Sequence, residues 1–165
     1  MKIKIVAFII LITLSLSSIL KADGYYSYSF GQFDSNGYSD RYFQSFETRF
    51  EYLSNENFIE KYEIKHFLGL MLNSDSGKYF YAGLRKDFSR SHVWNLTPSF
   101  AVGYYDQGSS KDLGSELQFR SQIELSFNLE KQKRIAFSFN HISNANLASH
   151  NPGTESFALS FINPF

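Results

Sequence analysis

Hydrophobic and polar residues alternate along most of the chain that follows the first 24 positions. In the clearest segment, apolar side chains take every second position from Leu117 to Leu129, with Ser121 as the single polar interruption. Polar or charged residues take the positions between them. A helix, with a period near 3.6 residues, would not gather this pattern into one apolar stripe. The segment therefore predicts a strand with one apolar face and one charged face.

Similar segments recur and predict an all-β protein. Several are about 10 residues or longer, which suits a tilted strand that crosses a bilayer, whereas strands of soluble proteins are usually about 5–6 residues long. Turn signals at 34–37, 54–57, 73–77 and 107–110 separate some of them. We therefore expect an eight-stranded antiparallel outer-membrane β-barrel with its apolar face toward lipid. The eight predicted strands are residues 25–33, 42–53, 62–72, 78–88, 94–105, 116–129, 134–143 and 155–165.

Two features of the sequence fit a membrane barrel less well. Pro98 lies inside the fifth predicted strand and cannot donate a hydrogen bond to a neighbouring strand. Lys65 and His66 are adjacent in the third predicted strand, so one of them must leave the polar face or lie near an interface. A soluble secreted barrel of the lipocalin kind is the alternative architecture.

The two ends of the chain indicate export to the outer membrane. Lys2 and Lys4 precede a mostly apolar segment at 5–20, which is the order of a secretory signal peptide. We place cleavage after Ala22, which leaves one domain at 23–165, and a retained membrane anchor is the alternative. The apolar run is short for a spanning helix, which needs about 20 residues. An aromatic residue, Phe165, ends the last amphipathic segment, as in the terminal signature of bacterial outer-membrane proteins.

The position of the N-terminus predicts which connections face outward. If it is periplasmic, the connections after the first, third, fifth and seventh strands face outward, and those after the second, fourth and sixth should be short. The segment 130–133 fits the second group.

Composition narrows the chemistry. The 16 basic and 16 acidic residues balance. The chain therefore lacks the excess of positive charge that would indicate a nucleic-acid partner. The chain has no cysteine, which excludes disulfides and thiol nucleophiles. Aromatic residues make up 18% of the chain although the mean hydropathy is −0.27, so aromatic and polar groups must lie on different faces. Charged residues of the polar face are explained as lumenal ion pairs in a narrow barrel: Glu47, Arg49, Glu51, Arg120 and Glu124.

Three polar residues depart from the alternation near the C-terminus. The phase of residues 134–143 places His141 and Ser143 on the lipid side, and Glu155 is in phase with Phe157 on the next strand. An outward loop joins the two strands, so the three side chains should meet at the outer rim of the barrel. Serine, histidine and a carboxylate are the parts of a hydrolytic triad. A polar belt at the membrane interface is the other explanation.

Short sequences around these residues carry a family resemblance. The segments His141-Ile-Ser-Asn-Ala and Asn151-Pro-Gly-Thr-Glu-Ser, together with the segment at 113–121, closely resemble the lipid A 3-O-deacylase (PagL) family. This resemblance covers roughly the last third of the chain and implies an eight-stranded outer-membrane barrel that removes the acyl chain at position 3 of lipid A. It implies Ser143 as the nucleophile, His141 as the general base and Glu155 as the orienting acid.

The supporting groups are less well determined by the sequence. The nearby candidates for an oxyanion hole are Asn144, Asn151 and the Gly153 N–H, of which we favour the two asparagines. Asn-Pro-Gly is also a turn signal, and Gly153 is best explained by that turn. His150 lies in the same loop, but no third ligand accompanies it and His141, so we predict no metal. No cofactor is expected.

The expected partners are lipid A or lipopolysaccharide as substrate and the membrane lipids around the barrel. A homodimer is compatible with the sequence but nothing in it requires one.

Two other functions remain open at this stage. An outer-membrane phospholipase also uses a His-x-Ser pair, but its third member is an asparagine and its barrel is larger and calcium-dependent. A non-catalytic barrel that serves structure or adhesion would show no special reactivity at Ser143.

Overall fold

The computed structural model describes residues 23–35, 44–89 and 91–165. The predicted signal peptide at 1–22 and the predicted start of the second strand at Tyr42 lie outside the described residues. Within the described ranges, no helix is long and apolar enough to cross a membrane.

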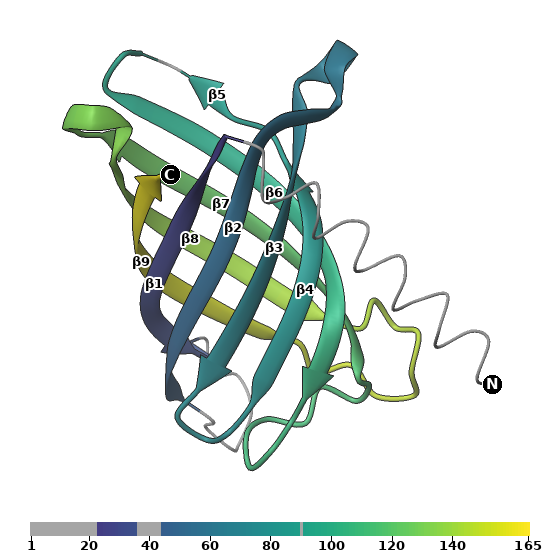
Figure 1. Ribbon diagram of the computed structural model, residues 1–165. Helices are drawn as coiled ribbons and strands as arrows, with labels where there is room; N and C mark the ends of the chain where they lie inside the picture. The colour runs from purple at the N-terminus through teal and green to yellow at the C-terminus, as the bar shows by residue number, and fades with distance from the viewer. Residues whose placement is uncertain (1–22, 36–43, 90) are drawn as a thin grey trace.

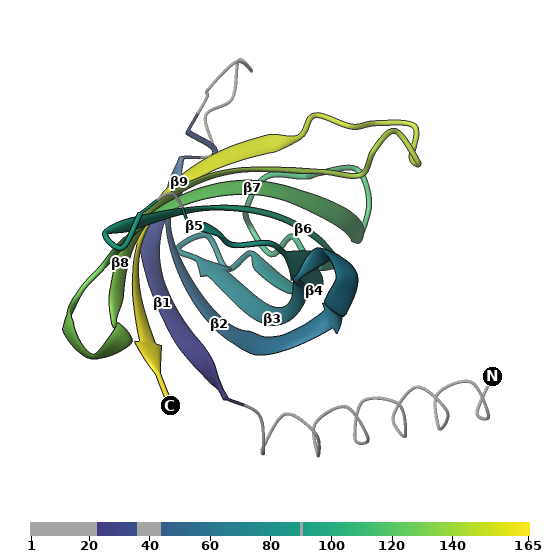
Figure 2. The same cartoon turned by 90° about the horizontal axis from the view of Figure 1, so that it is seen from above.

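Eight of the nine strands in the described residues close into an antiparallel barrel, as the alternation predicts (Figures 1 and 2). The order is β4-β3-β2-β1-β9-β8-β7-β6, and pairing between β4 and β6 completes the ring. The two-residue strand β5 adds only to β6. The strands are β1 Gly24–Phe33, β2 Ser45–Ile59, β3 Ile64–Asn73, β4 Lys78–Arg85, β5 Phe88–Ser89, β6 Trp94–Asp106, β7 Leu117–Asn128, β8 Arg134–Ser143 and β9 Thr154–Pro164.

The two ends of the barrel differ in their connections. The end where β1 begins and β9 finishes, uppermost in Figure 1, is here called the terminal end. It carries the connections β2–β3, β4–β6 and β7–β8, of which the first and last are single 3-10 turns, Glu60–Tyr62 and Glu130–Gln132. The opposite end, here called the loop end, carries β1–β2, β3–β4, β6–β7 and β8–β9. Two exceptions are β4–β6, which spans residues 86–93 at the terminal end, and β3–β4, which is a short turn at 74–77 at the loop end. The other connections follow the usual arrangement of an outer-membrane barrel, with short turns at one end and longer loops at the other.

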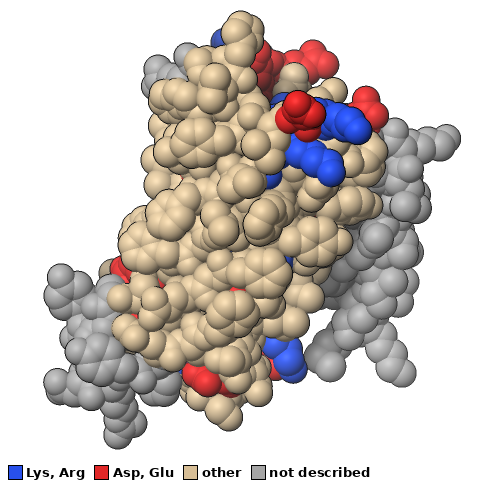
Figure 3. All heavy atoms as spheres, turned by 90° about the vertical axis from the view of Figure 1, so that its left-hand side faces the viewer, with Lys and Arg blue, Asp and Glu red and all other residues tan. Residues whose placement is uncertain are grey.

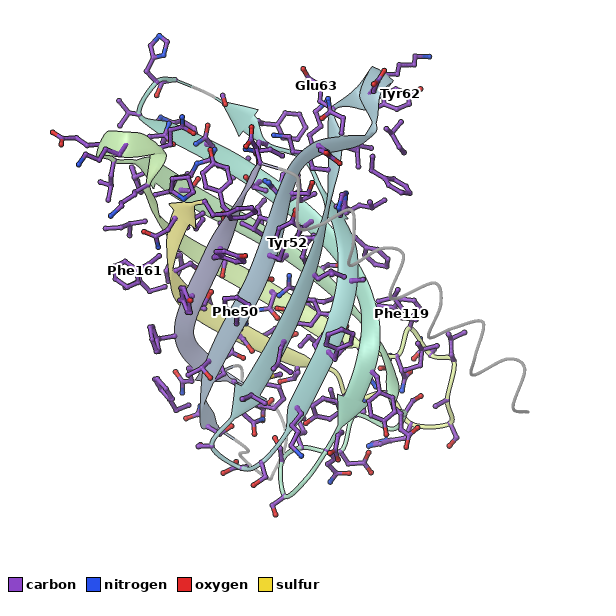
Figure 4. All side chains as sticks on the ribbon, viewed as in Figure 1. Phe50, Tyr52, Tyr62, Glu63, Phe119 and Phe161 are labelled. Carbon is purple, nitrogen blue, oxygen red and sulfur yellow. The ribbon has the colours of Figure 1, made fainter. Side chains whose placement is uncertain are left out.

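The outer surface carries a band of exposed aromatic and aliphatic side chains. Phe50 and Phe161 project from this surface and are 41% and 44% exposed (Figure 4). Aromatic rings pack side by side across neighbouring strands, as in the stacked pair Phe100–Phe119. On the face shown in Figure 3, charged residues gather toward the two ends and leave the middle almost free of them. Such a band would be costly in water but suits contact with hydrocarbon.

The interior of the barrel is polar and filled with side chains. The Arg120 guanidinium, 1% exposed, donates hydrogen bonds to Glu51 Oε1 at 2.8 Å and to Tyr81 Oη at 2.9 Å. Arg49 pairs with Glu47 and donates to Gln122. The predicted lumenal ion pairs are therefore confirmed for Arg120 with Glu51 and for Arg49 with Glu47. A barrel that is polar inside and apolar outside is the reverse of the soluble alternative.

The predicted turn at 54–57 is wrong. Strand β2 continues through these residues to Ile59, with irregular pairing to β3 after Leu53. The reversal comes later, in the 3-10 turn, where Glu63 adopts a left-handed conformation with φ of 54°. Turn-forming residues are compatible with a bulged strand edge, so composition alone did not locate the reversal. Figure 4 shows Tyr62 and Glu63 at the tip of the resulting hairpin.

The two features that fitted a barrel poorly have local explanations. Pro98 lies on β6 between the residues that pair with β4 and those that pair with β5, and its ring faces outward. Its carbonyl accepts a hydrogen bond from Lys86 N at 3.2 Å. On that side, no paired strand residue needs the missing donor. Lys65 points inward toward Asp87, whereas His66, on the opposite face of β3, packs edge-on against the Phe58 ring.

Asp87 closes the terminal end of the lumen. It pairs with Arg85 at 2.6 Å, accepts a hydrogen bond from Thr97 Oγ1 at 3.0 Å, and lies 3.7 Å from Lys65 and 3.9 Å from Arg134. Burial alone would raise the pKa of Asp87, but the surrounding positive charges outweigh burial and hold this pKa below its usual value. Asp87, two residues after β4, thereby contacts side chains from β3, β4, β6 and β8.

The lumenal pair predicts a large stability difference between two charge deletions. Arg120→Met leaves the buried Glu51 without the cation that donates a hydrogen bond to it and should destabilise the barrel by about 3–5 kcal/mol. Lys78→Met breaks the exposed Lys78–Asp106 pair at 3.5 Å and should cost about 0–1 kcal/mol. Thermal unfolding in detergent, followed by circular dichroism, measures both. Equal effects of the two substitutions would contradict a structural role for the lumenal pair.

Asp87 predicts a pH-dependent contribution to stability. Because its pKa is lowered in the folded state, the contribution is present above the unfolded pKa of about 3.9 and is lost as the pH falls through the folded value. Asp87→Asn should therefore lower the unfolding temperature at pH 7, and the difference from the wild type should shrink as the pH falls below the unfolded pKa of about 3.9. Parallel melts at pH 7 and through the acid range test this, and a difference that persists in strong acid would argue against the electrostatic origin.

Candidate active site

The imidazole of His141 and the carboxylate of Glu155 meet on the outer face of the barrel near the loop end. The two residues are directly paired across β8 and β9, and His141 Nδ1 lies 2.9 Å from Glu155 Oε1. The Glu155 side chain is 21% exposed and the His141 side chain 44% exposed. An ionised carboxylate can only accept, so the proton of this hydrogen bond belongs to Nδ1. In the neutral imidazole, Nε2 is then left as the basic nitrogen.

Ser143 lies two residues beyond His141 on the same face of β8. Residues i and i+2 of a strand point to the same side, so the hydroxyl and the imidazole are neighbours, as the phase of the sequence predicts. Among the described residues, no hydrogen bond joins Ser143 to His141. Hydrogen bonds of this type are often long without substrate and tighten when it binds. The structure therefore brings His141 and Glu155 into direct contact and places Ser143 on the same face of β8 as His141.

The strand β7 supplies the other side of the candidate site. Ser121 is paired with His141 and Phe119 with Ser143, on the same outward face. Ser121, the single polar interruption in the alternation of β7, thus lies beside the His141 imidazole. The alternation singled out Ser121 but did not show which residue it would pair with. Two residues from His141 and Glu155 along the same strands, the rings of Phe139 and Phe157 lie 5.0 Å apart, so these polar side chains adjoin the aromatic band.

Gly153 has a role that sequence reasoning missed. Its φ of +61° suits the predicted turn, but a Cβ at this position would also lie 2.9 Å from His141 Cε1. The glycine therefore provides the space against which the imidazole packs. Only the tertiary structure shows this contact, because the turn explains the residue sufficiently at the level of sequence.

The two predicted oxyanion donors are engaged in holding the β8–β9 loop. Asn144 is fully buried, and its Nδ2 donates to Leu113 O at 2.9 Å and to His150 O at 2.7 Å. Its backbone N–H donates to Asn151 Oδ1, and Asn151 Nδ2 donates to Asn146 Oδ1. Their role in an oxyanion hole stays a prediction, and it would require a rearrangement of these bonds.

Metal-ligating residues do not cluster in the part of the chain that the structure describes. No group of three or more histidine, aspartate or glutamate side chains is arranged there to hold an ion. His150 contributes its backbone carbonyl to Asn144. The imidazole of His141 is engaged with Glu155.

The fold and the candidate site together define a class of protein. A closed barrel with an apolar outer band and a polar lumen belongs in a bacterial outer membrane. A hydroxyl next to a carboxylate-bound imidazole gives its lipid-facing surface the parts of an esterase.

Comparisons with known proteins narrow this class. The family model described as lipid A 3-O-deacylase (PagL) matches residues 24–162, so the chain belongs to this family of outer-membrane deacylases. Comparison with curated proteins gave no match.

Solved structures agree in fold. The crystal structure of the outer membrane enzyme PagL is similar, with a TM-score of 0.65 and 15% identity over 86% of this chain and 99% of that chain. A de novo designed transmembrane β-barrel gives a TM-score of 0.61 and 8% identity over 87% and 96%. Neisserial surface protein A gives 0.51 and 12% over 87% and 96%. These likenesses show a shared fold, and a shared fold does not by itself assign an activity.

Gly153 predicts a local defect in activity without loss of the barrel. In Gly153→Ala the added methyl group would displace the His141 imidazole, and a misplacement near 1 Å can cost about a hundredfold in rate. Lipid A deacylation in detergent, with folding checked by heat-modifiable mobility in gel electrophoresis, measures this. Full activity in the folded variant would show that the imidazole tolerates the displacement or does not take part.

Proposed function

We propose that Ser143, His141 and Glu155 form the catalytic triad with which this lipid A 3-O-deacylase cleaves its ester. The observation that carries the proposal is the 2.9 Å contact between His141 Nδ1 and Glu155 Oε1 on the lipid-facing surface, with a serine two residues along the same strand. Polar side chains exposed to hydrocarbon are costly, and a catalytic role accounts for that cost better than an interface belt does. The His-x-Ser spacing and the position of the acid support the same assignment.

The first half of the reaction forms an acyl-enzyme. Ser143 Oγ attacks the carbonyl carbon of the ester while its proton passes to His141 Nε2. Glu155 holds the imidazole in the required tautomer and stabilises its positive charge. The tetrahedral intermediate then collapses, the bond between the carbonyl carbon and the sugar oxygen breaks, and the proton on Nε2 passes to that oxygen. The acyl group remains as an ester of Ser143.

The second half uses water and returns the enzyme to its initial state. A water molecule gives a proton to His141 Nε2 as its oxygen attacks the acyl-enzyme carbonyl. Collapse of the second tetrahedral intermediate breaks the bond to Ser143 Oγ, which takes the proton back. The released product is a fatty acid. These steps need no metal or cofactor.

The location of these residues suits a lipid substrate. The acyl chains of lipid A can stay in contact with the aromatic band while the ester lies at the level of the loop end, where His141 is 44% exposed. The substrate need not leave the membrane, so the cost of transferring its chains to water is avoided. We further propose that residues 1–22 are a signal peptide removed on export.

The phospholipase alternative is less well supported. It would place an asparagine where Glu155 stands. The residue directly paired with His141 on β9 is a carboxylate. The non-catalytic alternative leaves the polar cluster without a purpose.

Mass spectrometry of lipid A tests the triad. In a Gram-negative host, expression of the wild type should remove one 3-hydroxyacyl mass, whereas Ser143→Ala and an empty vector should leave lipid A unchanged. Glu155→Gln keeps the shape of the acid but loses its charge, and we expect a loss of about 10³–10⁴-fold in turnover with purified protein. A serine-directed fluorophosphonate should label the wild type and not Ser143→Ala.

The outcomes separate the nucleophile from the activity. Loss of the acyl chain with Ser143→Ala would overturn the nucleophile assignment and leave the deacylase activity standing. If the wild type is folded but lipid A is unchanged, purified protein with lipid A and with phospholipids in detergent distinguishes a silent enzyme from a different substrate. Inactivity toward both would favour the non-catalytic barrel.

A further inference from the structure

The segment 111–114 of the β6–β7 loop turns inward at the loop end of the barrel, unlike most loop residues, which are exposed. Lys111 and Leu113 are only 7% and 1% exposed. Tyr105 Oη donates a hydrogen bond to Lys111 O at 3.0 Å, and Gln118 Nε2 donates to Leu113 O at 3.3 Å. Strands β6 and β7 therefore hold this segment at both of its ends.

One arm of the segment reaches the strand that carries the acid. Lys111 Nζ contacts Asp34 Oδ1 at 2.6 Å, and the same oxygen accepts a hydrogen bond from Thr154 Oγ1 at 3.1 Å. Thr154 is fully buried and directly precedes Glu155. Next to Asp34, the Ser35 N–H and hydroxyl donate to Glu155 O at 2.8 and 3.1 Å. The Thr154 side chain before Glu155 is thus bound to Asp34 itself, and the Glu155 carbonyl is bound to Ser35, the residue after Asp34.

The other arm reaches the strand that carries the nucleophile. Leu113 O accepts a hydrogen bond at 2.9 Å from the buried amide of Asn144, which directly follows Ser143. The same amide donates to His150 O across the β8–β9 loop. At Gly114, with φ of +77°, the two loops approach so closely that a Cβ would lie 2.0 Å from His150 O. The contact between the loops therefore depends on the absence of a side chain.

We propose that residues 111–114 are a positioning element that sets the triad geometry by bracing Glu155 through Asp34 and Thr154, and Ser143 through Asn144. The inference rests on the triad proposed above. A buried ion pair contributes little net stability against its desolvation cost, so stability alone does not explain Lys111 and Asp34. The proposed triad residues come from two strands and share one direct hydrogen bond, between His141 and Glu155. The distance from Ser143 to His141 is therefore set by the backbone that carries the two residues.

Two glycines of the same loop provide a matched test. Gly114→Ala and Gly108→Ala each place a methyl group on a backbone with positive φ, and each methyl group would collide with a carbonyl oxygen of another loop. Gly114 faces His150 O in the β8–β9 loop, whereas Gly108 faces Ser76 O in the β3–β4 turn. We expect Gly114→Ala to lower kcat for lipid A deacylation about 10–100-fold with little change in KM. Gly108→Ala should stay within about twofold of the wild type, since its collision lies away from the braced residues.

A second pair of variants tests the acid arm. Thr154→Val keeps the shape of the side chain but removes the hydroxyl that donates to Asp34, and it should lower kcat and slow fluorophosphonate labelling of Ser143. Thr154→Ser restores the hydroxyl and should recover most of the loss. A purely structural role would change the unfolding temperature and the folded fraction, but it would not produce recovery of kcat at equal folded fraction.

The controls separate this proposal from the triad itself. All rates are normalised to protein that shows folded mobility in gel electrophoresis. Equal kcat for folded Gly114→Ala and Gly108→Ala, or equal kcat for Thr154→Val and Thr154→Ser, would overturn the positioning role. Activity that survives in Ser143→Ala would overturn the triad instead, whatever the loop variants do.

Discussion

The structure depends on one constraint, the need to satisfy every backbone hydrogen bond of a sheet that lies in hydrocarbon. Water cannot reach these groups in a bilayer, so an open edge would leave a row of unpaired donors and acceptors. Pairing of β9 with β1 and of β4 with β6 removes both edges. Closure in turn fixes which side chains face lipid and which face the lumen, and the narrow lumen must then be filled by groups that satisfy one another, as Arg120, Glu51 and Tyr81 do.

The same constraint makes the candidate site conspicuous. On a surface selected for contact with lipid, an imidazole, a carboxylate and a hydroxyl are out of place unless they act at that surface. Direct pairing across β8 and β9 brings His141 and Glu155 into contact without any special loop conformation. A membrane enzyme built in this way works on a lipid from the side, and the strand register of a rigid barrel supplies the preorganisation that soluble hydrolases obtain from a buried cleft.

The loop end shows how such a surface site can be held rigidly. Side chains on the outer face of a barrel lack a packed core around them, so their positions depend on the backbone that carries them. Hydrogen bonds on the lumenal side hold the side chains of Asn144 and Thr154, the residues just after Ser143 and just before Glu155. The polar interior therefore does more than fill space, since it connects β8 and β9, which carry the proposed triad, to the β6–β7 loop.

The amino-acid sequence by itself determined the number of barrel strands, their inward and outward faces, and the three polar residues that break the pattern. The reason is that side chains alternate with a period of two, so a shift of one residue would move every side chain of a strand to the other face. It did not determine where β2 turns back, since the residues at 54–57 suit a bulged strand as well as a turn. It also could not pair Arg120 with Glu51 or place Gly153 against His141. These contacts join residues far apart in the chain or in separate strands and loops, and only closure of the barrel, with its register and its docked loops, decides which side chains meet.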